Sequence, residues 1–123
     1  MQYSEDIFEE LFLAIRGDQT AFRWLMDNDY KELGAFTMAL NGKSDAYRWL
    51  EHNGFYNYSL IIKAAKRHTP SFDLLAELKE KEFACIVGVV HRDNNCKNWL
   101  QDHSFQELID LAQMIRNKLY PNG

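Results

Sequence analysis

The sequence predicts an all-α fold, an α-solenoid of about nine short helices that stack as helical hairpins. The first observation is a fixed period: Trp-Leu begins at Trp24, Trp49 and Trp99, and Leu74-Leu75 fills the gap, so the pair returns every 25 residues. The second is a column of small residues three positions before each pair, at Ala21, Ala46, Ser71 and Cys96. A period of this size is typical of stacked units that bury one another's apolar faces.

The third observation is a stripe of apolar columns in the same register. The columns that start at Phe8, Leu11 and Ala14 return every 25 residues with apolar or aromatic side chains. Because they are spaced three residues apart, they fall on one face of a helix with 3.6 residues per turn. The longer helices of the predicted hairpins therefore share one buried face.

Length and composition predict a single helical-repeat domain over residues 1–123. Apolar residues make up 46% of the chain and aromatic residues 14%, which is enough for a core. No basic region opens the chain and no apolar run approaches the roughly 20 residues that span a bilayer, so we expect neither export nor a membrane. Cys85 and Cys96 lack C-x-x-C spacing, which suits reduced thiols in a cytoplasmic protein.

The first expected element is a terminal cap helix over residues 5–16, with acidic side chains on its outer face. Gly17 ends this helix. Four repeats follow, each with a short helix and a longer one: 17–41, 42–66, 67–91 and 92–119.

In the first two repeats, the sequence predicts a short helix over 20–26, a longer helix to residue 40, a short helix to residue 52 and a longer helix over 55–67. Asp29 with Glu32 reads as a capping box for the first longer helix. Ser44 is the expected N-cap of the next short helix, and Gly54 turns the chain after it.

In the third repeat, Thr69 is the expected cap and Pro70 the first helical position, before a short helix over 72–79. In the fourth, Asn94 or Asn95 caps the short helix, and Ser104 with Glu107 opens a final helix to residue 119. Residues 83–90 are apolar nearly all round and could form a strand by propensity alone. The repeat register places a helix there, and we follow the register.

The tryptophan column is expected to lie in the core. Trp24, Trp49 and Trp99 stand beside the small column, which would let neighbouring short helices approach closely. We therefore assign these rings to packing between stacked units rather than to ligand binding.

The second repeat resembles an ankyrin repeat in its helix end, inter-helix glycine, second-helix apolar positions and closing glycine: Ala39, Gly42, Ala46, Trp49-Leu50 and Gly54. Elsewhere Arg67 and Arg92 replace the inter-helix glycine, and Asp29 replaces the closing one. The period is also shorter than the family's, which is about 33 residues. The missing residues correspond to the β-finger loops, so the chain looks like ankyrin-like helix pairs without fingers. The resemblance implies protein binding on an inner, concave face.

No pattern in the sequence indicates catalysis, a cofactor or a metal centre, so we expect a protein that is not an enzyme. Serine and histidine never occur in a G-x-S-x-G context, and no glycine-rich phosphate loop is present. His91 and Cys96 have a spacing that could start a metal site, but two further ligands would be needed.

The function predicted from these features is a protein-binding scaffold or adaptor that uses the inner face of the longer helices. The positions off the core stripe of the second repeat are Tyr56, Leu60 and Lys63. Packing of Tyr56 and Leu60 against neighbouring repeats is an equally good explanation of those two side chains.

The alternative is nucleic-acid or acidic-ligand binding along a basic edge. Cationic side chains gather near the ends of the longer helices, at Lys43, Arg67, His68 and Arg92. The helix dipole also favours cations at these positions without any ligand. The net charge of −4 argues against nucleic acid as the partner.

Overall fold

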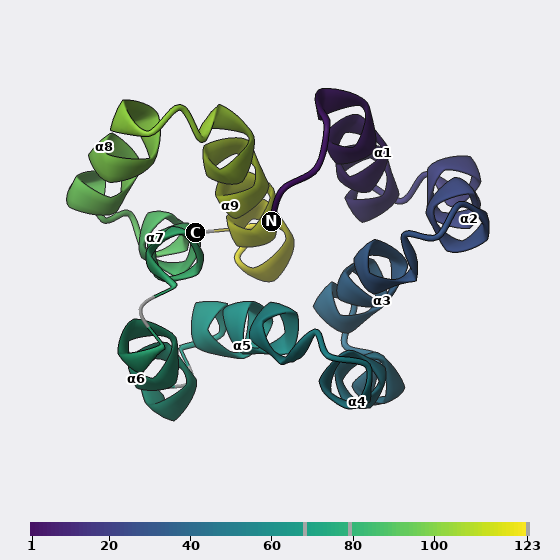
Figure 1. Ribbon diagram of the computed structural model, residues 1–123, viewed down its shortest axis with the longest axis horizontal. Coiled ribbons are helices and arrows are strands. Elements are labelled where there is room, and N and C mark those ends of the chain that lie inside the picture. Colours follow the sequence, from purple (N-terminus) through teal and green to yellow (C-terminus); the bar gives the residue numbers. More distant parts are fainter. Residues whose placement is uncertain (68, 79, 123) are drawn as a thin grey trace. The chain divides into compact units, whose positions relative to one another are not determined.

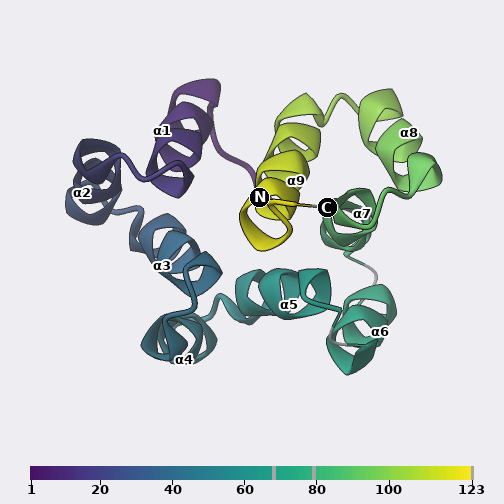
Figure 2. The ribbon, with the colours of Figure 1, turned by 180° about the vertical axis from the view of Figure 1, so that it is seen from behind.

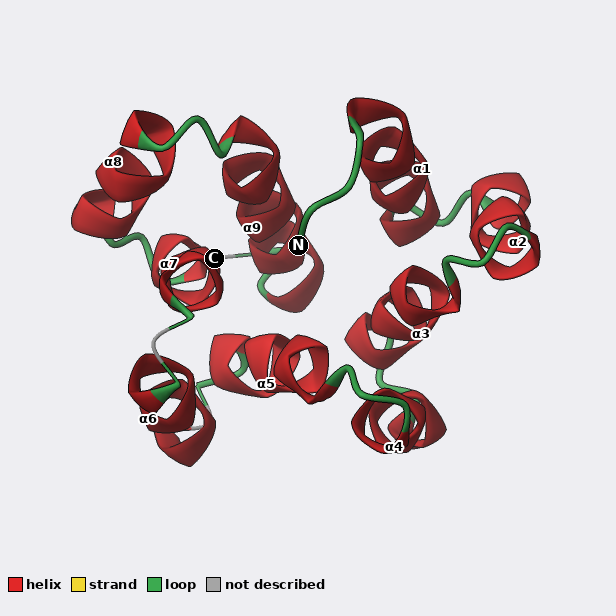
Figure 3. Ribbon diagram, in the orientation of Figure 1, coloured by secondary structure: helices red, strands yellow, loops and turns green. Residues whose placement is uncertain are grey.

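The computed structural model describes residues 1–67, 69–78 and 80–122, and these form nine helices and no strand (Figure 1, Figure 3). The helices are α1 (Glu5–Ile15), α2 (Gln19–Asp27), α3 (Lys31–Leu40), α4 (Ser44–His52), α5 (Tyr56–Ala65), α6 (Thr69–Glu77), α7 (Lys81–Val90), α8 (Asn94–Asp102) and α9 (Gln106–Leu119). The predicted all-α, solenoid-like fold of helical hairpins is confirmed.

The chain divides into two compact units, which we call the N-terminal unit (Met1–Tyr56) and the C-terminal unit (Asn57–Gly123). In the N-terminal unit α3 packs against α1, α2 and α4, and in the C-terminal unit α7 packs against α6, α8 and α9. Both views show α3 between the two short helices of its unit (Figure 1, Figure 2). Each unit thus has one longer helix at its centre.

The 25-residue period is a property of the backbone. A nine-residue helix, a ten-residue helix and two three-residue loops make up one repeat. Seven loops have a described middle residue, and in all seven this residue has a positive φ: Gly17, Asp29, Gly42, Gly54, Arg67, Arg92 and Ser104. After six of these residues, the next N–H donates to a carbonyl in the last turn of the preceding helix, as from Phe55 to Leu50 at 2.8 Å, and the residue after Arg67 lies outside the described ranges. This is the Schellman arrangement that ends helices.

The Schellman turns explain why the two predicted capping boxes are wrong. Asp29 and Ser104 have φ angles of 69° and 60°, in the left-handed region, rather than the extended backbone of an N-cap. The helices α3 and α9 begin one residue later, after Tyr30 and Phe105, without a side-chain cap bond. Each of these polar residues closes the preceding helix.

Three other predicted helix starts are also corrected. Ser44 is the first residue of α4, and Lys43 precedes it without a side-chain cap bond. Asp93, rather than Asn94 or Asn95, caps α8, because its carboxylate accepts from the backbone N–H groups of residues 95 and 96. The helix α6 begins at Thr69, three residues before the predicted start.

The apolar run over residues 83–90 is a helix, as the register predicted. It lies in α7, and all of its residues except Ala84 are buried. Burial therefore explains the lack of a polar face.

The prediction that the tryptophans lie in the core is wrong for Trp24, which is 39% exposed, and Trp49 and Trp99 are only partly buried. The buried column is the next residue along: Leu25, Leu50, Leu75 and Leu100 are all 0% exposed. Adjacent residues on a helix point about 100° apart, so only one member of the Trp-Leu pair can face the core directly.

Candidate functional site

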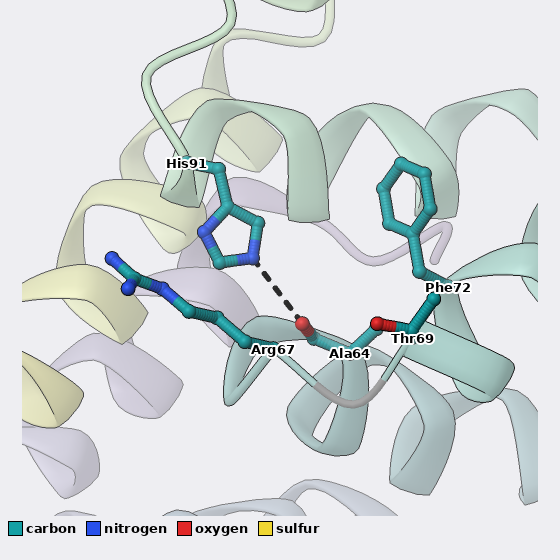
Figure 4. Close-up of a pocket in the computed structure, with 5 residues that line it drawn as sticks. All are labelled: Ala64, Arg67, Thr69, Phe72 and His91. Atoms are coloured by element: carbon teal, nitrogen blue, oxygen red, sulfur yellow. Dashed lines mark hydrogen bonds between the residues drawn. The ribbon is translucent and has the colours of Figure 1, made fainter.

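A surface pocket lies in the C-terminal unit where the end of α5, the start of α6 and the end of α7 meet (Figure 4). Its volume is about 320 Å³, and it is lined by Ala64, Arg67, Thr69, Phe72 and His91. We call it the α5–α7 pocket. It combines two basic side chains and a hydroxyl with an apolar wall.

The imidazole of His91 is fixed by the end of α5. Its Nε2 atom lies 3.2 Å from the carbonyl oxygen of Ala64, the contact drawn as a dashed line in Figure 4. A carbonyl oxygen only accepts hydrogen bonds, so Nε2 carries the proton in this contact. Among the described residues, the other ring nitrogen, Nδ1, has no hydrogen-bond partner.

Arg67 is positioned by Tyr120. The Arg67 guanidinium lies over the Tyr120 ring, 5.3 Å from its centroid, and Arg116 lies 5.6 Å from the same centroid. In turn the Tyr120 hydroxyl donates to the carbonyl of Ala65 at 2.7 Å, and Arg116 donates to that of Val90. Side chains near the C-terminal end of α9 therefore satisfy carbonyls at the ends of α5 and α7.

The Arg67 guanidinium retains hydrogen-bonding capacity. Within the described ranges, no carboxylate lies within ion-pairing distance of it and no group accepts a hydrogen bond from it. The contact with the Tyr120 ring is electrostatic and uses no hydrogen-bond acceptor, so the guanidinium N–H donors remain available.

The other side of the α5–α7 pocket is built by α6. Phe72 is 39% exposed, and its ring stands across the pocket from Arg67 (Figure 4). Thr69 is the first residue of α6, so the positive end of that helix dipole borders the pocket.

The same pocket recurs in the N-terminal unit, and each of its counterparts stands 50 residues earlier in the chain. This pocket, the α1–α3 pocket, has a volume of about 230 Å³ and is lined by Ala14, Gly17, Gln19, Phe22 and Asn41, with Thr37 and Met38. The alanine and the phenylalanine are the same in both pockets. The two basic residues of the α5–α7 pocket are replaced by glycine and asparagine.

A third hollow lies on α3, between α2 and α4. It is lined mainly by apolar side chains and has a volume of about 240 Å³: Met26, Lys31, Ala35, Met38, Asp45, Ala46 and Trp49. Its acidic member is engaged, because Asp45 pairs with Arg48 at 2.9 Å. This hollow offers flexible methionines and one tryptophan but little fixed polarity.

The predicted protein-binding residues have different environments. Tyr56 is 44% exposed and Lys63 is partly exposed, whereas Leu60 is only 2% exposed and belongs to the core. Leu60 is therefore removed from the predicted binding face. Seven of the ten residues of α5 are buried, so most of this helix, including Leu60, faces the core.

Of the three described residues of the predicted basic edge, one lines the α5–α7 pocket. Arg67 lines the α5–α7 pocket, Arg92 is exposed in the loop after α7, and His68 lies outside the described residues. Lys43 is exposed and belongs to the N-terminal unit. The sequence indicated that Arg67 and His91 lie along one edge, but it did not predict a pocket that they share with Phe72.

The two cysteines interact across the α7–α8 hairpin. Burial, followed by a hydrogen bond to Cys85, raises the pKa of the Cys96 thiol to about 12. The Sγ atom of Cys96 also packs directly on Gly88. Within the described residues, no cluster of three or more histidine, cysteine or acidic side chains could hold a metal ion.

The helices in the described part of the chain are too short or too polar to cross a membrane. Comparison with protein-family models, with curated proteins and with solved structures found no match.

Proposed function

We propose that this chain is a non-catalytic protein-binding scaffold that binds its partner through equivalent pockets of its helical repeats. The observation that carries the proposal is the recurrence of one pocket, with the same alanine and phenylalanine, in both units. Helical-repeat proteins commonly bind along surfaces built from equivalent positions of successive repeats. The ankyrin-like pattern of the second repeat supports a protein partner.

The shape of the pockets favours side chains over a whole small molecule. Their volumes, about 230 and 320 Å³, lie at or below the small end of ligand cavities, and both open to solvent at helix ends. Such hollows accept single side chains of a partner, and a few well-placed anchors can supply most of the affinity of an interface.

The loops that carry the pocket residues suit this role. Gly17 and Arg67 each have a positive φ, and their N–H groups donate to the carbonyls of Ala14 and Ala64 at 3.0 and 2.8 Å. Turns of this kind hold their backbone with hydrogen bonds to the preceding helix, so little ordering is needed on binding.

The proposal is tested by photo-crosslinking from the two pockets. A photoreactive amino acid replaces Gln19 in one variant and Thr69 in another, both of which are exposed and line a pocket. Exposed positions outside the pockets, Glu9 and Gln101, serve as controls. We expect one partner protein to be captured from both pocket positions and from neither control. Equal capture from all four positions, or none, contradicts the proposal.

Reconstituted binding to the captured partner then measures the contribution of the pocket wall. Phe72→Ala is expected to weaken binding by about tenfold or more, as removal of an interface anchor does. Leu78→Ala removes another exposed apolar side chain of the same unit, at 46% exposure, and should leave affinity unchanged. The double variant Tyr56→Ala, Lys63→Glu tests the face of α5 instead. If only that double variant loses binding, the interface lies on α5 and not at the pockets.

A further inference from the structure

We propose that the α5–α7 pocket binds an oxyanion, a carboxylate or a phosphoryl group carried on an apolar or aromatic stem. Arg67 and His91 would hold the oxyanion, and Phe72 would contact the stem. The inference rests on the proposed function, because the oxyanion would belong to a residue of the partner protein.

The comparison of the two pockets gives the first argument. Between the α1–α3 pocket and the α5–α7 pocket, the alanine and the phenylalanine are unchanged, and Gln19 is replaced by Thr69, another neutral residue. Gly17 is replaced by Arg67 and Asn41 by His91, and both of these replacements introduce a basic side chain. The lining of the α1–α3 pocket is uncharged, so only the α5–α7 pocket has side chains that attract an anion.

The fixed positions of the two basic side chains give the second argument. The Arg67 guanidinium lies over the Tyr120 ring, and Nε2 of His91 lies 3.2 Å from the carbonyl oxygen of Ala64. Because these contacts already hold both side chains, little ordering is needed when an oxyanion binds.

Electrostatics gives the third argument. The C-terminal unit has nine cationic and eight acidic side chains, whereas the N-terminal unit has five and ten. Arg67 and Arg116 both lie over Tyr120, and His91 lies in the same pocket as Arg67. Within the described residues, no ion pair neutralises Arg67. A planar guanidinium with free edge N–H groups matches the paired oxygens of a carboxylate or phosphoryl group.

The test is an NMR titration of the isotope-labelled full chain with small probes. Phenyl phosphate and phenylacetate both have an aromatic stem and an oxyanion, and benzyl alcohol has the same stem without charge. We expect the oxyanions to shift amide resonances of residues 64–72 and 91 but not those of 14–22 and 41, with an effect that weakens as salt is added. The probe that binds more tightly shows whether the pocket prefers a phosphoryl group or a carboxylate. Equal shifts with benzyl alcohol, equal responses of both pockets, or no response overturns the inference.

Matched variants separate the pocket from a general basic field. Arg67→Gly with His91→Asn gives the α5–α7 pocket the residues that its counterpart has at these two positions, and should weaken oxyanion binding at least about tenfold. Arg92→Gly removes the same charge from an equivalent turn, at a φ of 64°, outside the pocket. It should leave binding unchanged, and an equal loss in Arg92→Gly overturns the inference.

The experiments distinguish a failure of the oxyanion site from a failure of the proposed scaffold function. If the partner is captured from position 69 while neither oxyanion binds, the scaffold proposal stands and the oxyanion site does not. If the oxyanions bind but no partner is captured, the pocket chemistry stands and the scaffold proposal fails.

Discussion

The indole of Trp49 stacks on the ring of Phe55, with centroids 6.2 Å apart and planes within 5° of parallel. The side-chain amide of Asn53 donates to the carbonyl of Trp49 at 2.7 Å, so the same turn is held from two sides. Equivalent stacks join Trp24 to Tyr30 and Trp99 to Phe105. The tryptophan column therefore covers the turns after the short helices.

This arrangement predicts that Trp49→Ala is less damaging than Leu50→Ala. Leu50 is 0% exposed, and its truncation should cost about 2–5 kcal/mol of unfolding free energy. Truncation of the partly buried Trp49 should cost about 1–3 kcal/mol, and truncation of the more exposed Trp24 less. Urea unfolding followed by circular dichroism measures all three. If the Trp49→Ala protein is less stable than the Leu50→Ala protein, Trp49 rather than Leu50 is the main core residue of the pair.

The Trp-Leu pair shows what sequence periodicity could and could not determine. The period located every helix because the apolar columns agree over the whole chain. It could not decide which member of two adjacent apolar residues is buried, since both lie near the same helical stripe. The side chains of Asp29 and Ser104 suit an N-cap, and only the backbone angles show that they end the preceding helix.

The pocket was beyond sequence reasoning for a different reason. Its geometry depends on contacts between helix ends that are distant in sequence, such as the bond from Tyr120 to Ala65, 55 residues apart. No local pattern indicates such a contact. The basic character of Arg67 was predicted, but its place beside His91 required the packed structure.

Backbone strain at Arg67 is measurable by comparing two substitutions. Arg67→Ala and Arg67→Gly both remove the contact with Tyr120, but only glycine relieves the positive φ. We expect Arg67→Gly to be more stable than Arg67→Ala by about 1 kcal/mol. In the opposite direction, Gly17→Ala should destabilise the protein, although no atom lies within 4 Å of the added methyl group. Equal stability of the two Arg67 variants would show that the turn carries no such strain.

Close packing of α7 on α8 predicts a penalty for Gly88→Ala. The added Cβ would overlap the Sγ atom of Cys96 and stand 2.9 Å from its Cβ. Overpacking of this kind costs about 1–3 kcal/mol, and Cys96→Ala should recover part of it in the double variant. Gly34→Ala is the control, because its added Cβ meets the flexible end of Met26. A Gly88→Ala protein with an unchanged melting temperature contradicts this packing.

The raised pKa of Cys96 predicts slow alkylation of the native protein. A shift from 9.0 to about 12 lowers the thiolate fraction at pH 8 by about a thousandfold, and the thiolate is the reactive form. Iodoacetamide labelling of native and urea-unfolded protein, mapped by mass spectrometry, measures the difference. The folded state also keeps a proton that the unfolded chain loses above pH 9, so unfolding free energy should fall as the pH rises from 9 toward 12. Native labelling as fast as unfolded labelling is the contrary result.

The contacts made by Tyr120 predict a measurable loss in Tyr120→Phe. The ring and its two arginine contacts remain, but the carbonyl of Ala65 loses its hydroxyl donor. We expect a loss of about 1–2 kcal/mol of unfolding free energy. Denaturant unfolding compared with wild type checks the value. An unchanged midpoint would mean that water replaces the hydroxyl without cost.

The uniform three-residue loops also constrain how such a chain can change length. One residue inserted into a loop would displace the left-handed middle position, on which the hydrogen bond that closes the turn depends. A whole copy of 25 residues brings its own two turns and presents the same faces at each end. Duplication of a complete repeat therefore preserves every turn, whereas insertion or deletion of a single residue between helices disrupts one.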